Sequence, residues 1–218
     1  MHNICIIGPD GAGKTSHITK LIAKFGQQDQ EYKYCWLGSR YLLSIPLLLY
    51  ARAMGYTSVE VPPNGEKVSY HHFEESKFLC FFYPLSLWLD TVIHLTLKYY
   101  IPRYILGQNI ICDRFVFDTL IDLGLSINHK EIISTKIGKL FLRLVPSKLV
   151  VILLIADPEQ LRKRRSDVYY DKKIAEKVVA YRRLATQLDI PIIDANSRSE
   201  TVQKEIIRIM RKYVDTIT

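Results

Sequence analysis

The sequence of 218 residues predicts an α/β fold with about five parallel strands and helices on both faces of the sheet. A glycine-rich turn, Gly8–Thr15, separates the apolar run 3–7 from a stretch whose apolar residues recur at helical spacing, namely Ile18, Leu21, Ile22 and Phe25. Short apolar runs then alternate with helical stripes to the end of the chain. Neither a repeat nor a linker interrupts them, so residues 1–218 are expected to form a single domain.

The turn fits the P-loop pattern, which is a glycine, four residues and then Gly-Lys-Ser/Thr. A loop that enters a helix N-terminus presents backbone N–H groups to phosphate, and glycines let the backbone come close. Lys14 would bring a cation to the β- and γ-phosphates, and the Thr15 hydroxyl would ligate magnesium. We therefore expect a three-layer P-loop NTPase fold, with a chance glycine-rich turn as the alternative. The expected nucleotide-binding residues are Gly8, Asp10, Gly11, Ala12, Gly13, Lys14, Thr15 and Ser16.

Composition and charge narrow the class of protein. Hydrophobic residues make up 48% of the chain and charged residues 24%, which is typical of a globular domain. The net charge of +8 favours anionic partners such as nucleotides, nucleic acid or a membrane surface. Because the chain has no run of five basic residues and no basic tail, we expect a small-molecule nucleotide or another phosphate acceptor as the partner, and no nucleic acid.

The cysteines and the start of the chain bear on its compartment. Cys5, Cys35, Cys80 and Cys112 form no Cys-x-x-Cys pair, and buried reduced thiols are favoured over a metal or redox role. The first apolar run begins almost at Met1, which leaves no room for a leader peptide. A cytoplasmic protein is therefore expected.

The first half of the chain contains one further strand and a very apolar stretch. Residues 32–37 alternate and predict a strand that ends at Gly38-Ser39-Arg40. Ligands of open parallel sheets lie at the carboxyl ends of strands, so Arg40 is placed to meet an anion, with a solvated arginine at a helix start as the alternative. Residues 41–54 are very apolar, and 55–65 have the composition of a loop.

A longer apolar segment, 78–97, has the length of a membrane span. It contains Pro84, Asp90 and His94, and an aspartate near a bilayer centre costs about 2.5–3.5 kcal/mol. We therefore expect no span, but helices that are buried in the core or partly in a homodimer interface.

The second half continues the alternation of strand and helix. The runs with strand character are 109–112, 149–155 and 191–193, and the helical stripes are 132–144 and 174–188. The first two runs lead into Asp113-Arg114 and Asp157-Pro158, and the third ends at Asp194. Ser197 and Glu200 fit a capping box that opens the last helix.

A P-loop enzyme needs a carboxylate at the end of a neighbouring strand to hold magnesium. Asp113 and Asp157 both follow apolar runs that predict strands. Arg114 comes directly after Asp113 and adds a cation for phosphate, whereas Pro158 marks Asp157 as a helix N-cap. The expected magnesium ligands are therefore Thr15 and Asp113.

Four successive basic residues, 162–165, are the other notable feature of the second half. We interpret them as part of a lid at about 160–172, because phosphoryl transfer depends on cations placed around the developing charge. An exposed basic helix face is the alternative, and 166–173 suits a mobile loop. The candidate catalytic residues are Lys14, Arg114, Arg162 and Arg165.

Taken in this order, the motifs resemble those of the thymidylate-kinase family of nucleoside monophosphate kinases. The matching pieces span nearly the whole chain: Pro9-Asp10-Gly11, Gly107 ahead of Asp113-Arg114-Phe115, Asp157-Pro158 with its basic lid, Tyr181, and Ile193-Asp194-Ala195. The resemblance implies a kinase of nucleotide biosynthesis that uses ATP and Mg²⁺ to convert dTMP to dTDP. It also implies that Asp10 contacts the 3′-hydroxyl of the acceptor sugar, and that Asp113 and Arg114 serve magnesium-bound water and the acceptor phosphate.

The acceptor side departs from the family pattern. Gly38-Ser39-Arg40 stands where the family has Arg-Glu-Pro, and no arginine lies between Lys77 and Arg103, where the family places one on the helix that holds thymine. Trp88 or Phe82 could stack on a base, but a core role is favoured over stacking for either ring. The candidate acceptor-binding residues are Asp10, Arg40, Trp88 and Arg114.

Three other readings of the sequence stay open. The first is a P-loop kinase of another small acceptor, such as a different nucleotide or a sugar. The second is a non-catalytic nucleotide-binding protein, although the guanine motif Asn-Lys-x-Asp is missing from the sequence. The third is peripheral membrane attachment through the apolar stretches 41–54 and 78–97.

Overall fold

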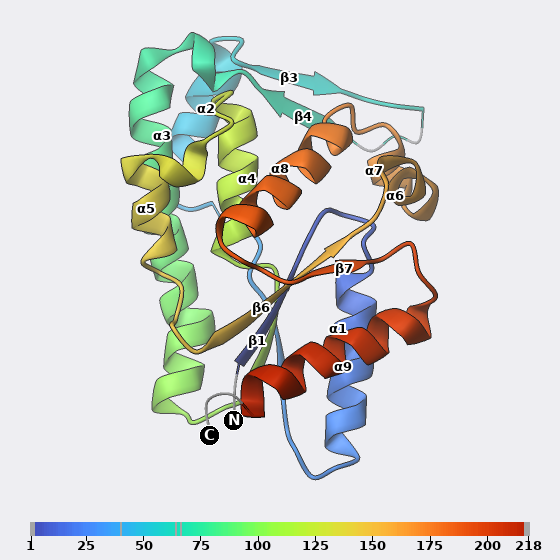
Figure 1. The fold of residues 1–218 in the computed structure, drawn as a ribbon. Helices are drawn as coiled ribbons and strands as arrows, with labels where there is room; N and C mark the ends of the chain where they lie inside the picture. Colours follow the sequence, from blue (N-terminus) through green and yellow to red (C-terminus); the bar gives the residue numbers. More distant parts are fainter. Residues whose placement is uncertain (1–2, 40, 64, 66, 216–218) are drawn as a thin grey trace.

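Five parallel strands form one sheet in the order β2-β5-β1-β6-β7 in the computed structural model, which describes residues 3–39, 41–63, 65 and 67–215 (Figure 1). The strands are β1 (Asn3–Ile7), β2 (Lys33–Trp36), β5 (Ile110–Asp113), β6 (Leu149–Ile155) and β7 (Ile192–Asp194). Every residue of β1 and β5 is buried, as expected for central strands that are covered on both faces. The predicted α/β class with about five parallel strands is confirmed.

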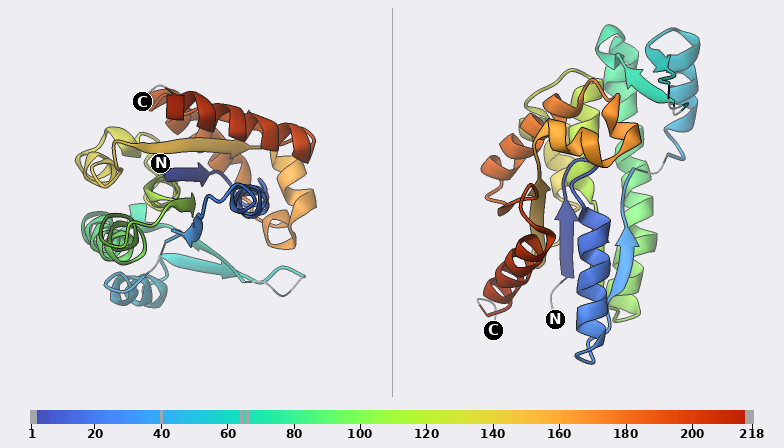
Figure 2. Two further views of the ribbon diagram at one scale, coloured as in Figure 1. Left: turned by 90° about the horizontal axis from the view of Figure 1, so that it is seen from below. Right: turned by 90° about the vertical axis from the view of Figure 1, so that its right-hand side faces the viewer.

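Helices flank the sheet on both sides (Figure 2). α1 (Lys14–Gly26) contacts β1, β2 and β5, and Figure 1 shows it across the sheet from the long helix α3 (Lys77–Leu95). α3 continues as a π-helix, Thr96–Ile105, whose Tyr99 hydroxyl accepts a hydrogen bond of 2.8 Å from Asn3 at the start of β1. The other helices are α2 (Ile45–Ala53), α4 (Val116–Ser126), α5 (Lys136–Leu142), α6 (Pro158–Arg164), α7 (Ser166–Tyr169), α8 (Ile174–Gln187) and α9 (Ser199–Asp215).

An antiparallel hairpin lies outside the main sheet and corrects the expected loop at 55–65. It pairs β3 (Thr57–Glu60) with β4 (Val68–His71). The hydroxyl of Tyr70 donates to the carbonyl of Tyr170 over 3.3 Å and accepts from the backbone N–H of Lys172 over 3.1 Å. These contacts with a segment about 100 residues later in the sequence position the hairpin, and no local sequence pattern predicts them.

Three helix boundaries also differ from expectation. The stripe at 132–144 is not one helix, because Thr135 caps a new helix at Lys136 by accepting a bond of 3.0 Å from the Gly138 N–H. α9 begins at Ser199, so the expected capping box at Ser197 is not its start. The segment 166–173, expected as a loop, contains the short helix α7.

The apolar segment expected in the core is buried on one side only. The helix Lys77–Ile105 is long and apolar enough to cross a membrane, and 33% of its most apolar window is buried. Leu79, Tyr83 and Leu87 of α3 pack into the core, whereas Phe81 is 68% exposed on another side of the helix. The expected core burial is therefore found on one side of α3, while the other side is exposed in the single chain, where the expected homodimer interface stays a prediction.

Candidate functional site

The Gly8–Thr15 loop joins β1 to α1 at the carboxyl edge of the sheet. Gly8, Gly11 and Gly13 have φ angles of 143°, 85° and 86°, which residues with a side chain rarely adopt. A Cβ on Gly8 would also lie 2.1 Å from the carbonyl oxygen of Leu154. The path of the backbone therefore requires the three glycines.

A cavity of about 370 Å³ opens beside this loop. Four cationic side chains and two carboxylates line it, which favours an anionic ligand. The residues that line it are Asp10, Gly11, Gly13, Lys14, Thr15, Ser16, Trp36, Asp113, Arg114, Arg164 and Arg165. All but Trp36 and Arg164 were candidate site residues of the sequence. Of the other loop candidates, Ala12 is buried, and Gly8 packs against β6.

The Lys14 side chain folds back onto its own loop. Its Nζ donates to the carbonyl oxygens of Gly8 and Pro9 over 2.8 and 2.9 Å, and the residue is 6% exposed. Burial and the positive charge of Arg114 lower the pKa of Lys14 below its ordinary value. The ammonium group is thus held in place by neutral acceptors that an anion can replace.

A hydroxyl and a carboxylate meet at the other end of the cavity. Thr15 Oγ1 donates to Asp113 Oδ2 over 2.5 Å, and the Tyr34 hydroxyl donates to the same oxygen over 3.0 Å. Asp113 is buried, and Tyr34 was not predicted as a site residue, although its alternating strand gave its position. Burial and the charge of Asp113 raise the pKa of Tyr34 to about 12, so this hydroxyl stays a donor at neutral pH.

The rival carboxylate, Asp157, lies elsewhere. It precedes α6, is exposed, and accepts a bond of 3.1 Å from the Asn196 side chain. It does not line the cavity beside the loop. Thr15 and Asp113 are therefore the two expected magnesium ligands that the structure brings together.

Arg114 and Arg165 converge on Asp10. Arg114 Nη2 pairs with Asp10 Oδ1, and Arg165 Nη1 lies 3.5 Å from the same oxygen. Burial raises the pKa of Asp10, but Arg114, Lys14, Lys177 and Arg165 together lower it below its usual range. The carboxylate therefore stays ionised between the two guanidinium groups.

A second layer of contacts positions Arg114. Its backbone has a φ of 68°, a left-handed conformation that costs energy for a residue with a side chain. Its Nη1 lies 3.8 Å from Asp118, which accepts bonds of 2.6 Å from the Tyr181 hydroxyl and 2.9 Å from the Phe115 N–H. The Tyr181 hydroxyl and the Phe115 N–H each donate to one oxygen of Asp118. Burial raises the pKa of this carboxyl. The buried Tyr181–Asp118 pair supports the arginine from behind.

The basic segment contributes Arg165, as expected, and Arg164 in place of the expected Arg162. Arg164 Nη1 donates to the Gly11 carbonyl over 3.4 Å and its Nη2 to the Ala195 carbonyl over 2.8 Å. Arg165 lines the cavity too and also bonds Asp167 over 2.5 and 2.8 Å. Arg162, a candidate catalytic residue, does not line this cavity. It precedes Arg164 by two positions on α6, where a helix turns each side chain to a different direction.

A smaller cavity of about 210 Å³ lies next to the first, between α3, α4, α8 and the hairpin. Tyr83 of α3, Thr119 and Asp122 of α4, and Lys177 of α8 line it, together with Tyr41. Lys177 is near enough to Asp10 for its charge to lower the pKa of that carboxyl. The two cavities share no lining residue, but this electrostatic reach between Lys177 and Asp10 leads us to treat them as neighbouring parts of one candidate site.

Neither of the two rings that the sequence offered for stacking on a base lines this smaller cavity. Trp88 does not line it, and its Nε1 donates to the Leu140 carbonyl of α5 over 3.3 Å. Phe82, the alternative stacking ring, is 43% exposed and likewise outside it. Arg40 lies outside the described residues. The aromatic residues of the cavity are instead Tyr41, Tyr70 and Tyr83, with His71, and tertiary contacts place them there.

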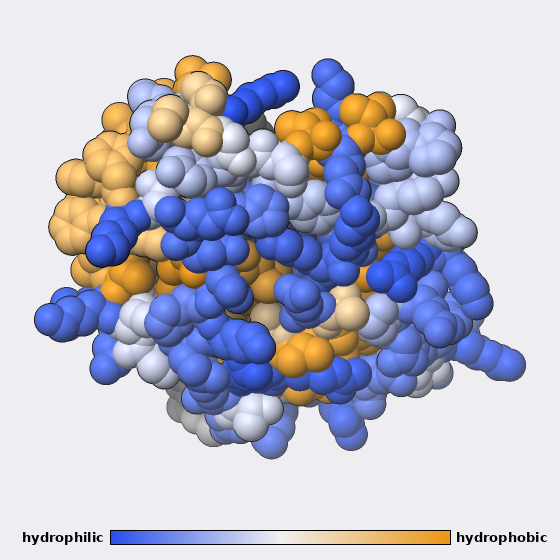
Figure 3. All heavy atoms as spheres, turned by 90° about the horizontal axis from the view of Figure 1, so that it is seen from above, coloured by the Kyte–Doolittle hydropathy of each residue, from blue (hydrophilic) through white to orange (hydrophobic). Residues whose placement is uncertain are grey.

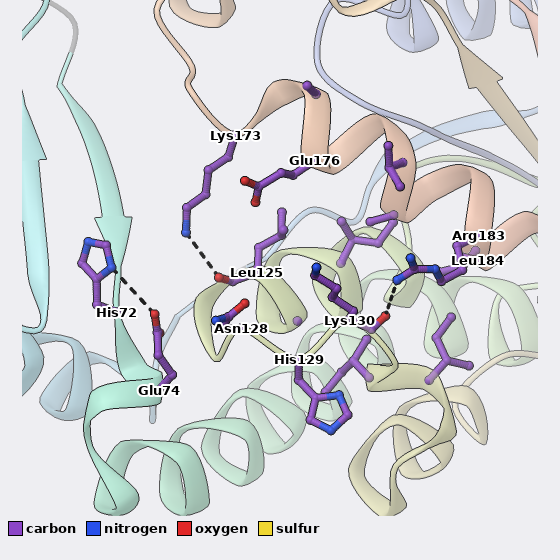
Figure 4. Close-up of a pocket in the computed structure, with 17 residues that line it drawn as sticks. His72, Glu74, Leu125, Asn128, His129, Lys130, Lys173, Glu176, Arg183 and Leu184 are labelled. Carbon is purple, nitrogen blue, oxygen red and sulfur yellow. Dashed lines mark hydrogen bonds and ion pairs between the residues drawn. The ribbon is translucent and has the colours of Figure 1, made fainter.

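A larger cavity, of about 640 Å³, is lined by residues of α4 and α8 among others (Figure 4). It shares Leu125 and Lys173 with the smaller cavity, and Lys173 Nζ donates to the Leu125 carbonyl over 3.3 Å. His72 and Glu74 lie on one side of it in Figure 4 and Arg183 on the other, with both charge signs represented. None of the residues around the glycine-rich loop reaches it, so its size does not make it the phosphate site.

Neither the protein-family models nor the curated proteins supply a relative for this chain. No protein-family model matches it, and no curated protein matches its sequence. The resemblance to the thymidylate-kinase family therefore stays a prediction, and the geometry of the site has to carry the functional argument.

Proposed function

We propose that the chain is a P-loop phosphotransferase that uses ATP and Mg²⁺, with a nucleoside monophosphate as the acceptor and dTMP as the first acceptor to test. One observation carries the proposal. Lys14, the Thr15–Asp113 pair and the Arg114–Asp10–Arg165 cluster all face one cavity at the carboxyl edge of a parallel sheet. Ligands of open parallel sheets bind at this edge.

The donor phosphates would lie against the first turn of α1. The backbone N–H groups of Gly13, Lys14 and Thr15 precede or open the helix, where the helix dipole favours negative charge. Lys14 would exchange two carbonyl acceptors for phosphate oxygens, and a hydrogen bond to an ionised acceptor is stronger than one to a neutral acceptor. The loop therefore needs no large rearrangement to offer its lysine.

The Thr15–Asp113 pair fits a magnesium ion. A hydroxyl and a buried carboxylate are the hard oxygen donors that Mg²⁺ takes, usually together with phosphate oxygens and water. When bound, Mg²⁺ would neutralise charge on the donor phosphates. The Tyr34 hydroxyl would hold the carboxylate in its orientation by continuing to donate to Oδ2.

The arginines suit the transfer itself. In the proposed reaction an acceptor phosphate oxygen attacks the γ-phosphorus, the bond to the bridging oxygen breaks, and ADP leaves. Because that oxygen is already anionic, no general base is required. Arg114, Arg164 and Arg165 would stabilise the charge spread over the transferred group, and Asp10 would orient two of the three guanidinium groups.

The neighbouring smaller cavity is the place for the rest of the acceptor. Its tyrosines offer a stacking surface for a base, and Thr119, Asp122 and Lys177 offer hydrogen-bonding groups. A different nucleotide or a sugar is the second candidate acceptor. The carboxylates of Asp122 and Asp171 in this cavity favour it, because they accept hydrogen bonds from hydroxyl groups.

Two measurements test the proposal. Calorimetry with Mg–ATP should give saturable binding, and its absence would remove the assignment. ADP release should then be followed over a panel of nucleoside monophosphates and sugars. Release that depends on dTMP supports the first acceptor, and release with another member supports the second. Binding of ATP without transfer to any member would identify a non-catalytic nucleotide-binding protein.

A further inference from the structure

α3 carries an exposed apolar stripe on the side that turns away from the core. The stripe recurs every three or four residues, each member at least 39% exposed: Phe78, Phe82, Leu85, Leu89, Ile93 and Leu97. At roughly 1.5 Å per residue it runs for on the order of 30 Å along the helix. Single exposed apolar residues are ordinary, but a contiguous stripe of this length marks an interaction surface.

α2 widens this stripe into a surface. The ring centroids of Tyr50 and Phe78 are 5.4 Å apart, those of Phe78 and Phe82 4.7 Å, and those of Phe81 and Phe82 5.0 Å. Leu49 of α2 is 64% exposed and Phe81 is 68% exposed. Figure 3 shows hydrophobic residues gathered on the side of the molecule that α3 occupies in Figure 1. We call this surface, from both helices and the π-helix after α3, the α2–α3 face.

Cations outnumber carboxylates around the α2–α3 face, where the exposed carboxylates Glu74 and Glu75 directly precede the start of α3. Within 41–56 and 77–109 the sequence has a single carboxylate, Asp90. Asp90 is 3% exposed and accepts hydrogen bonds from the backbone N–H groups of residues 42–44 and from the Ser44 hydroxyl. The same two segments expose the cations Arg52, Lys77 and Lys98. The two segments thus combine exposed apolar side chains with cations and expose no carboxylate.

We propose that the α2–α3 face docks onto an anionic lipid bilayer, with α3 lying in the interface and its apolar stripe directed into the lipid. An apolar stripe accompanied by basic residues is what interfacial helices present to acidic lipids. The helix does not span, because its other side packs into the core and Asp90 holds residues 42–44. A second copy of the chain is a poorer occupant, since it would bring the cations of both copies together, and the exposed carboxylates that precede α3, Glu74 and Glu75, lie at one end of the helix only.

Co-sedimentation of the full chain with vesicles tests this docking. We expect binding to phosphatidylcholine vesicles that contain about 30% phosphatidylserine, weak binding without the acidic lipid, and release when the salt concentration is raised from about 0.1 M to about 0.5 M. Replacing Phe81 and Phe82 together by Ser should lower the apparent lipid affinity about tenfold or more, because two exposed rings leave the interface. Val179→Ser on α8, where Val179 is 56% exposed, is the matched control and should change nothing.

A charge variant keeps the test decisive if the double serine variant unfolds. Arg52→Glu combined with Lys98→Glu leaves the apolar stripe intact and should weaken binding to the acidic vesicles alone. Failure of the parent chain to bind acidic vesicles overturns the proposal. A lipid-free dimer in sedimentation velocity that the double serine variant disperses also overturns it, because a second copy would then cover the face. Neither outcome touches the phosphate chemistry, which is measured without lipid.

Discussion

The two neighbouring cavities of the candidate site are built in different ways. The cavity beside the loop takes its side chains from short segments that directly follow strands or open helices, chiefly 8–16, 113–114 and 164–165. The smaller cavity takes single residues from α3, α4, α8 and the hairpin, which lie far apart in the sequence. Contiguous motifs set up the first, and tertiary packing sets up the second. Most of the residues that line the cavity beside the loop could therefore be predicted from the sequence, while those that line the smaller cavity could not.

The largest expected effect tests the cavity beside the loop. Lys14→Ala should lower kcat for ADP release at least about 100-fold, because it removes a buried cation that would contact the donor phosphates in the proposed reaction. Lys20→Ala is the control, since Lys20 lies on the same helix but is exposed and bonds Ser199. Steady-state kinetics with both variants measure the difference. Equal turnover of the two would show that this loop plays no part in transfer.

The next effect separates the two carboxylates that the sequence offered for magnesium. Asp113→Asn should weaken the apparent affinity for Mg²⁺ by about 10- to 100-fold, because it takes a charged oxygen ligand away from the Thr15 hydroxyl. Asp157→Asn should leave it unchanged, since Asp157 faces Asn196 outside the cavity. Titration of activity with Mg²⁺ gives both values. The reverse ranking would move the metal to the end of β6.

Much of the fold followed from local pattern. The strand 149–155 and the helix α8 could be predicted because the spacing of their apolar residues and the lengths of the two segments were both clear. α4 was not predicted. Its polar residues Asp118, Asp122 and Ser126 recur at helical spacing, but Asp118 and most of the other residues of this helix are buried. The hairpin was not predicted, because Pro62 and Pro63 gave its turn the composition of a loop and because Tyr70 anchors it to a segment that is distant in the sequence.

The residues of the candidate site show the same difference between local sequence motifs and tertiary packing. Lys14, Thr15, Asp113 and Arg114 were predicted because each belongs to a motif with a fixed place at a strand end. Trp88 was an acceptor candidate by residue type alone, and its indole packs against α5 instead. The residue type alone does not say which way a side chain points, so the aromatic rings that line the smaller cavity could not be predicted from the sequence.

A moderate effect is expected on the acceptor side. Lys177→Met should raise the acceptor KM about tenfold while the affinity for ATP stays the same, because Asp122 and Asp171 lose their shared cation within the smaller cavity. Asp122 and Asp171 raise the pKa of Lys177 against the effect of burial, so the group is charged at neutral pH. Lys172→Met removes a neighbouring exposed lysine that pairs with Glu60 and serves as the control. If the affinity for ATP changed instead, the smaller cavity would not be specific for the acceptor.

The smallest effect concerns stability in acid and again contrasts neighbouring groups. Asp10 has a lowered pKa in the fold, so its pairing with Arg114 and Arg165 stabilises the protein above the ordinary value of 3.8 and is lost as the pH falls below it. The parent should therefore be more stable than Asp10→Asn at pH 6, by less than about 1 kcal/mol for this partly exposed carboxylate, and the difference should vanish in acid. Urea unfolding between pH 6 and pH 3 measures it.

Asp118 gives the opposite sign and so controls for a general loss of stability in acid. Burial raises its pKa in the fold, so the folded state takes up a proton before the unfolded state does. The parent should gain stability relative to Asp118→Asn as the pH falls through that raised value toward 3.8. Opposite slopes for the two variants would show that Asp10 is ionised beside the cavity, whereas burial disfavours the ionised form of Asp118 behind Arg114. Parallel slopes would mean that the two carboxylates share one environment, and the layered support of Arg114 would have to be abandoned.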